Sequence, residues 1–149
     1  MVNSRQIHEI KKPKAVIFDT DNTLYPYDSA HSAGMEAVQN KAMLLLGITP
    51  HEFEEAFGKA RADVKQKLHG TASSHSRLLY FQRTVELLGL GTKILLTLDL
   101  EQTYWRSFLV NTRLFPGAKD FICQLKSDGI ITANITDLTA QIQFRKMVY

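Results

Sequence analysis

Two aspartates that follow a short apolar run constrain the fold of this chain more than any other feature. The run covers residues 15–18, Ala-Val-Ile-Phe, and Asp19 and Asp21 come directly after it, with one residue between them. Four consecutive apolar residues, half of them β-branched, predict a strand over 14–19 that is buried on both faces, as in a parallel sheet. Because side chains alternate along a strand, both carboxylates are expected to lean the same way.

Like charges at one strand end repel each other, and burial strengthens the repulsion. A divalent cation removes this conflict, and Mg²⁺ prefers a few carboxylates together with waters and phosphate oxygens. Asp19 is then a candidate nucleophile toward a phosphoryl group, and Asp21 a candidate acid and base for the leaving alkoxide and the attacking water. The structural alternative is a strand end with a capping or Asx turn, in which Asn22 and Thr23 are ordinary turn residues.

Thr136 and Asp137 form a second candidate site, for phosphate binding. They follow a predicted strand over 130–135 and precede a helix expected from Leu138 onward. The threonine hydroxyl and nearby backbone N–H groups could hold a phosphate, although Asp137 could equally be an ordinary helix cap. Ligands of open α/β sheets bind at the carboxyl ends of strands, so this pair is expected near the acidic pair if the two strands are neighbours.

The stretch between the two predicted strands is predicted to be helical. A capping box with proline at the first helical position begins one helix at Thr49-Pro50-His51-Glu52. Four helices with short connections predict a small bundle inserted into a β-α-β unit, and hence an α/β fold. The four helices of the bundle are expected over about 29–46, 50–68, 75–88 and 92–110, the last with a candidate interruption at 97–100. A further helix over 118–128 would belong to the β-α-β unit.

Composition excludes several classes of function. The chain has 18 basic and 15 acidic residues, a net charge of +3 that is too mild to predict nucleic-acid binding, even with lysines at 11, 12 and 14. No apolar run is long enough to span a bilayer, and the polar lead-in over 1–13 lacks the apolar segment of a signal peptide. The single cysteine, Cys123, allows no internal disulfide and is expected to be buried in a helix, which favours a cytoplasmic protein.

Several other polar residues are expected to be structural. Arg77 and His31 could reach a substrate from the helical insert, but a surface position is the simpler expectation for each. Lys146 lies on the last predicted helix and is expected to be a solvated helix-end charge rather than a catalytic lysine. Tyr104 and Trp105 are expected to pack within the insert.

These motifs together resemble a known family. Residues 18–24, Phe-Asp-Thr-Asp-Asn-Thr-Leu, resemble the first motif of the haloacid dehalogenase superfamily, most of whose members are Mg²⁺-dependent phosphohydrolases. Tyr25-Pro26 is similar to the pyrimidine 5′-nucleotidase-like members with helical caps. Three later segments are also similar to features of this family. Residues 114–118, with Leu125 and Gly129, are similar to the segment that re-enters the core after a helical cap. Residues 130–136 are similar to the second motif, and residues 141–146 to the helix that follows that motif.

The resemblance implies a partial Rossmann-like α/β core with two parallel strands and an inserted all-helical cap of about four helices. The core would comprise 1–24 and 114–149, and the cap 25–113. An aspartate at position 21 favours phosphoryl transfer over dehalogenation. The implied parent reaction is hydrolysis of a small phosphate monoester, such as a nucleotide or a sugar phosphate, with Mg²⁺ as cofactor.

The resemblance also assigns roles to residues by their position in the motifs. Asp19 would be the nucleophile and a metal ligand, and Asp21 the acid and base, with its backbone carbonyl on the metal. Thr136 would bind the phosphate. Asp137 stands where many relatives have asparagine, which places a negative charge near the phosphate.

A second departure concerns the family's third motif, a lysine, and its fourth motif, a set of acidic metal ligands. Neither is found after the second motif within these 149 residues. We therefore expect weak or absent Mg²⁺ binding, little activity of this chain alone, and an exposed apolar edge at 16–18 that could pair with another chain in an oligomer. The alternatives are a half that another chain completes, a non-enzymatic binding module in which the aspartates are relics, and a truncated reading frame.

Overall fold

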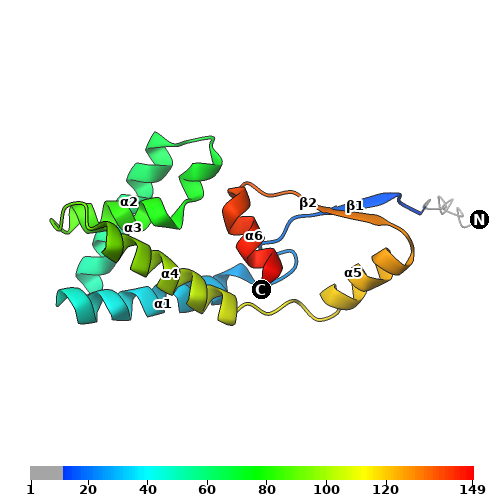
Figure 1. Ribbon diagram of the computed structural model, residues 1–149, viewed down its shortest axis with the longest axis horizontal. Helices are drawn as coiled ribbons and strands as arrows, with labels where there is room; N and C mark the ends of the chain where they lie inside the picture. The colour runs from blue at the N-terminus through cyan, green and yellow to red at the C-terminus, as the bar shows by residue number, and fades with distance from the viewer. Residues whose placement is uncertain (1–11) are drawn as a thin grey trace, which may run out of the picture.

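The computed structural model describes residues 12–149, so most of the predicted polar lead-in, Lys11 included, lies outside the described residues. The fold is α/β with two parallel strands, as predicted (Figure 1). In chain order the elements are β1 (Ala15–Phe18), α1 (Tyr27–Leu46), α2 (Pro50–Lys67), the 3₁₀ helix η1 (Ala72–His75), α3 (Arg77–Leu87), α4 (Ile94–Val110), α5 (Ala118–Ser127), β2 (Ile131–Asn134) and α6 (Ala140–Val148).

The two strands form a small parallel sheet. Ala15 pairs with Ile131 and Phe18 with Asn134, and α5 packs against β2 to complete a β-α-β unit. The prediction that β1 is buried on both faces is wrong, because 66% of Ile17 is exposed. Within residues 12–149, β2 is the only strand that pairs with β1, which leaves one edge and part of each face uncovered.

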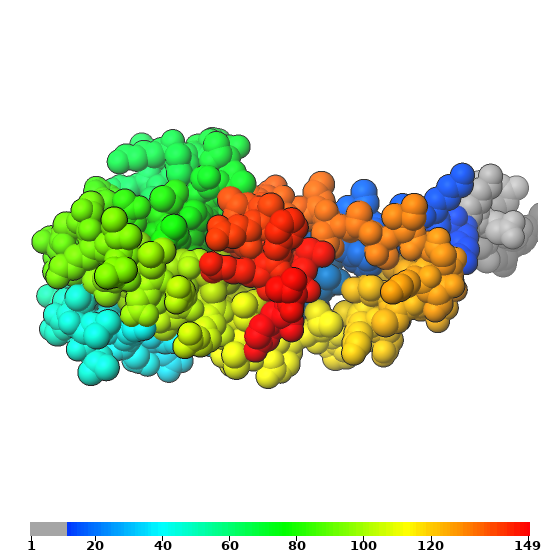
Figure 2. All heavy atoms as spheres, in the orientation of Figure 1, coloured from blue at the N-terminus to red at the C-terminus, as the bar shows by residue number. Residues whose placement is uncertain are grey.

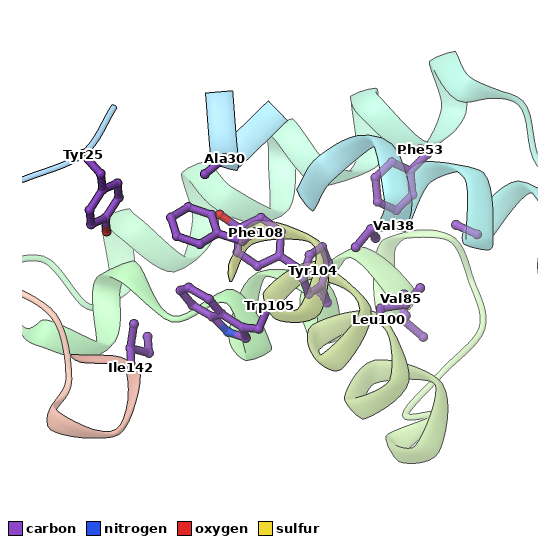
Figure 3. Packing of buried hydrophobic residues seen from close by; sticks show 12 residues of the cluster. Tyr25, Ala30, Val38, Phe53, Val85, Leu100, Tyr104, Trp105, Phe108 and Ile142 are labelled. Atoms are coloured by element: carbon purple, nitrogen blue, oxygen red, sulfur yellow. The ribbon is translucent and has the colours of Figure 1, made fainter. Parts of the chain in front are cut away.

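Helices α1 to α4 form a bundle that holds most of the buried apolar surface. Helix α1 packs along α4, and α2 packs along α3. The rings of Tyr104, Trp105 and Phe108 gather at the centre of this core (Figure 3), which confirms the packing expected for the first two. Gly34 lets α1 approach α4 closely, since a Cβ atom there would lie 2.8 Å from two ring atoms of Tyr104.

The helix boundaries follow local chemistry. The capping box before α2 is present: the Glu52 N–H donates to Thr49 Oγ1, and the Thr49 N–H donates to the Glu52 carboxylate at 2.7 Å. Gly47, with φ of 65°, ends α1 in the left-handed conformation that glycine adopts without strain. The candidate interruption at Thr97–Leu100 is wrong, because α4 is continuous and the Thr97 hydroxyl donates to the Lys93 carbonyl inside the helix.

Helix α6 lies between the sheet and the bundle (Figures 1 and 2). Its Ile142 joins the apolar core of the bundle, and Arg145 Nη1 lies 2.7 Å from Glu101 Oε1 on α4. Cys123 was expected to be buried but is exposed, because the described part of the chain covers only one side of α5. No helix within residues 12–149 is long and apolar enough to cross a membrane.

Candidate functional site

A cavity of about 260 Å³, here called the central cavity, opens between the bundle, the loop after β1 and helix α6. Four basic side chains and one carboxylate line it, so its surface is strongly cationic. Its lining residues are Asp21, Asn22, Tyr27, Arg61, Lys65, His75, Arg77, Tyr80, Trp105, Leu138, Ile142 and Lys146.

A tight turn after β1 sets the position of the two aspartates. The Leu24 N–H donates to the Thr20 carbonyl at 2.9 Å, which folds the chain back directly after the strand. Asn22 adopts φ of 59°, a left-handed conformation that asparagine tolerates better than most residues, and its side-chain oxygen accepts the Tyr27 N–H at 2.8 Å. Asn22 is therefore a turn residue, as the alternative of an ordinary turn predicted. Its hydrogen bond to Tyr27 also fixes the start of α1 close to the acidic pair.

The two aspartates have different surroundings. Asp19 is exposed and accepts a hydrogen bond from the Thr23 hydroxyl at 3.3 Å. Asp21 is half-buried, lines the central cavity, and accepts hydrogen bonds from Lys146 and from the Tyr25 hydroxyl. Burial, followed by the hydrogen bond to Asp21, raises the pKa of Tyr25, so this hydroxyl stays a neutral donor. Asp19 is thus open to solvent, whereas Asp21 is held by two donors.

Lys146 is not the solvated charge predicted from the sequence. Its side chain is 5% exposed, its Nζ lies 2.6 Å from Asp21 Oδ1, and it sits 5.5 Å from the ring centre of Phe108. Burial lowers the pKa of the lysine, and hydrogen bonding to Asp21 opposes this effect. The position has a simple cause, since Lys146 lies one helical turn after the buried Ile142 and shares its inward face. That four-residue spacing was the signal available in the sequence.

Arg77 is also partly buried rather than placed on the surface as expected. Ser76 caps α3 through the Leu79 N–H, and Arg77 is therefore the first residue of the helix. Its guanidinium carbon lies 5.3 Å from the ring centres of both Tyr80 and Tyr104. These two rings come from different helices, so no local pattern in the sequence identified this position.

His31 was expected on the surface and is instead packed into the bundle beside Arg77. Its Nδ1 lies 2.8 Å from the Tyr104 hydroxyl, and its ring stacks on Tyr27 with centres 5.2 Å apart. Burial, together with the positive charges of Arg77 and Arg61, lowers the pKa of His31 to about 4. The histidine is therefore neutral at physiological pH.

The second predicted pair lies beside the central cavity rather than in its lining. Thr136 is half-buried in the loop between β2 and α6, and its hydroxyl accepts the Leu138 N–H at 3.1 Å. Asp137 is exposed and lines a neighbouring cavity of about 390 Å³, together with Lys65 and His75. The structure thus brings Asp21 together with basic residues that the sequence analysis had set aside, and keeps Thr136 and Asp137 to one side.

The donors available for a metal ion are oxygen atoms of the acidic pair. Within residues 12–149, no three His, Cys, Asp or Glu side chains gather into a metal-binding cluster. Carboxylates are the ligand type that Mg²⁺ prefers, and this ion keeps several waters when few protein ligands are present. Asp19, with its exposed carboxylate, fits such a role more readily than Asp21, whose Oδ1 atom is already engaged.

Comparison with known proteins agrees with these motifs. A sequence profile of the haloacid dehalogenase-like hydrolases matches residues 13–145. A ribulose-1,5-bisphosphate 5-phosphatase from Halopiger xanaduensis is 40% identical to the chain over 134 residues, which cover 89% of this chain. The match spans 56% of the length of that relative. The profile match covers nearly the whole chain, and the chain therefore belongs to the haloacid dehalogenase-like hydrolase family.

Proposed function

We propose that the chain carries the nucleophile and the acid/base residue of a phosphatase that hydrolyses a small phosphate monoester. The observation that supports this most is the placement of Asp21 in a cavity lined by four basic side chains, with Asp19 at the same strand end. A cationic cavity attracts phosphate, and carboxylates beside it can act on the phosphorus and on the leaving oxygen. The Halopiger relative is named as a phosphatase, which supports the same class of reaction.

In the proposed reaction the Asp19 carboxylate attacks phosphorus, and the bond between phosphorus and the substrate oxygen breaks. Asp21 enters this step in its protonated form and gives the proton to the departing alkoxide. The carboxylate that remains then takes a proton from the water that releases phosphate from Asp19, which restores the protonated form. Lys146 and Tyr25 donate to the Asp21 carboxylate and so fix its orientation. Thr136, placed after the neighbouring parallel strand, remains the proposed phosphate ligand, with Asp137 beside it.

We also propose Mg²⁺ as the cofactor, held by the Asp19 carboxylate and by Asp21. When bound, the ion would neutralise phosphate charge and orient the phosphoryl group for in-line attack. Two carboxylates are a small ligand set, and Lys146 already occupies one oxygen of Asp21. We therefore expect the 149-residue polypeptide to bind Mg²⁺ weakly and to turn over slowly by itself.

The division into a core of 1–24 and 114–149 and a cap of 25–113 is part of the same proposal. The bundle supplies Arg61, Lys65 and Arg77 to the central cavity, and the loop after β1 supplies Asp21. This shared lining supports a cap that covers a catalytic core. The Halopiger relative carries the name of a sugar bisphosphate phosphatase, so a phosphorylated sugar is the first substrate to try.

The test is Mg²⁺-dependent release of phosphate from an aryl phosphate by the purified polypeptide, with acid-stable labelling of Asp19 followed by mass spectrometry. We expect a slow rate that disappears in Asp19→Asn and with a metal chelator. Asp120→Asn changes an exposed acid on α5 and is the matched control, which should keep the rate. A rate that survives Asp19→Asn would contradict the proposal.

The exposed edge of β1 leads to a separate proposal about assembly. Ile17 is 66% exposed, and an unpaired apolar strand edge favours pairing with another chain. Native mass spectrometry over a range of concentrations measures this directly. A dimer that Ile17→Lys disrupts would support pairing through this strand, and a monomer at all concentrations would exclude it.

A further inference from the structure

Three cations of the central cavity have no carboxylate partner. Among the ion pairs within residues 12–149, none includes Arg61, Lys65 or Arg77. The one carboxylate in the lining is that of Asp21, and Lys146 already pairs with it. Within the described part of the chain, no carboxylate therefore pairs with the positive charge on the bundle side of the cavity.

Arg77 carries the strongest evidence for a missing partner. It donates to the His75 carbonyl at 3.2 Å and to the Tyr27 hydroxyl, both of which are uncharged acceptors. Its Nε atom is buried and has no hydrogen-bond partner in the described part of the chain. A buried donor without an acceptor is costly and rare, so a guanidinium kept in this state points to an acceptor that comes from outside the protein.

Arg61 and Lys65 extend the same charged surface along α2. They are four residues apart, which places them on one face of the helix, and both line the cavity with Arg77. Burial is the largest cause that lowers the pKa of His75, and the charges of Lys65 and Arg77 lower it further. Burial likewise lowers the pKa of His31, and the charges of Arg77 and Arg61 act in the same direction. Three adjacent cations make a site for a group with more than one negative charge.

We propose that Arg61, Lys65 and Arg77 bind a second phosphoryl group of the substrate, so that the site selects small metabolites with two phosphates. One phosphate would lie at the acidic pair and the other at these three residues, which line the same cavity as Asp21. A phosphoryl group carries close to two negative charges at neutral pH, which suits three uncompensated cations better than a single carboxylate does. This inference rests on the proposed function for the position of the first phosphate. Binding of the second phosphate does not require that the hydrolysis reaction takes place.

The test uses Trp105, the only tryptophan of the chain, which lines the cavity and reports occupancy by its fluorescence. Three sugar probes are titrated into the full chain: glucose 1,6-bisphosphate, glucose 6-phosphate and 6-phosphogluconate, which carries a carboxylate in place of the second phosphate. We expect the bisphosphate to bind at least about tenfold more tightly than the other two, the range of one charged hydrogen-bonded contact. Equal affinity for the bisphosphate and the monophosphate would overturn the proposal, and equal affinity for the bisphosphate and 6-phosphogluconate would overturn its assignment to phosphate.

Variants then assign the preference to residues. Arg77→Gln and Lys65→Gln should each weaken the bisphosphate by about tenfold and change the monophosphate little. Lys67→Gln, an exposed lysine on the same helix outside the cavity, is the matched control and should keep the preference. Arg77 is partly buried, so its variant is checked by thermal melting, and Lys65→Gln carries the test if Arg77→Gln unfolds. A loss of affinity that is equal for all three probes would contradict a separate subsite.

The same set of proteins separates this proposal from the proposed function. In Asp19→Asn the reaction is blocked, yet the preference for the bisphosphate should remain. Tighter binding of the bisphosphate without any Asp19-dependent hydrolysis would support the second phosphate site and contradict the proposed phosphatase activity. Asp19-dependent hydrolysis with equal affinity for the monophosphate and the bisphosphate would support the phosphatase activity and contradict the second phosphate site.

Discussion

Lys146 and Asp21 are 125 positions apart in the sequence, and the lysine Nζ lies 2.6 Å from the Asp21 carboxylate. The lysine side chain is 5% exposed and that of the aspartate 30%. The pair fastens the last helix to the turn that carries the candidate catalytic residues. Loss of one partner should therefore affect both the docking of α6 and the geometry of the turn.

We expect Lys146→Met to lower the free energy of unfolding by about 2 kcal/mol, because it leaves a half-buried carboxylate without its cation. In a double-mutant cycle with Asp21→Asn, the coupling energy should be about 1–2 kcal/mol. Urea denaturation followed by circular dichroism measures all four proteins. Lys126→Met, at an exposed lysine on α5, is the control and should be nearly neutral. Additive effects of the two substitutions would show that the pair contributes nothing.

A second pair holds the same helix from its other side. Glu101 has a side chain that is 11% exposed, and its carboxylate lies 2.7 Å from Arg145 Nη1. Arg145→Met should cost about 2 kcal/mol and raise the rate of amide hydrogen exchange in α6, since a buried carboxylate would lose its charged donor. Arg106→Met removes an exposed arginine from α4 and should change neither quantity. Unchanged exchange in α6 after Arg145→Met would mean that the apolar contact of Ile142 suffices for docking.

The close approach of α1 and α4 at Gly34 leads to a paired prediction. A Cβ atom there would lie 2.8 Å from ring atoms of the fully buried Tyr104, which has no room to move. Gly34→Ala should therefore destabilise the chain by about 1–2 kcal/mol, despite the higher helix propensity of alanine. Gly58→Ala in α2 meets nothing within 4 Å and should stabilise it by about 0.5–1 kcal/mol. Thermal melting of both variants tests the pair, and the same sign for both would contradict the packing argument.

The features that the sequence predicted well are those that depend on neighbours along the chain. The apolar run before Asp19 and the capping box at Thr49 each carry their cause within a few residues, and both lie where they were expected. The exposure of Ile17 could not be predicted in the same way, because it depends on how many strands lie beside β1.

The candidate site was predicted only in part, for a related reason. The acidic pair is a local motif. Arg77, in contrast, is partly covered by tyrosines from two helices, and the Lys146 side chain is buried by the docking of α6 onto a turn near the other end of the chain. Most arginine and lysine side chains are exposed, so exposure was the expectation for Arg77 and Lys146. It failed at these two positions because tertiary contacts cover the side chains. Residues that violate such an expectation are concentrated at functional sites, which agrees with their place in the central cavity.

The buried His31 makes stability depend on pH in a defined window. Its pKa is lowered to about 4 in the folded chain, from an ordinary value of 6.5, first by burial and then by the charges of Arg77 and Arg61. Above pH 6.5 the histidine is neutral in both states and contributes no pH dependence. As pH falls from 6.5 toward 4, the unfolded chain takes up a proton that the folded chain does not, so the free energy of unfolding decreases, by about 2 kcal/mol after allowance for solvent screening.

Substitution separates this contribution from that of carboxylates that titrate at similar pH. The difference in unfolding free energy between the wild type and His31→Gln should shift between pH 6.5 and 4 and stay constant above pH 6.5. His51→Gln changes an exposed histidine on α2 and is the control for the loss of a histidine side chain as such. An NMR titration of the His31 ring gives the pKa directly. A midpoint near 6.5 would contradict the packing of His31 between Tyr27 and Tyr104 and the positive charge inferred beside it.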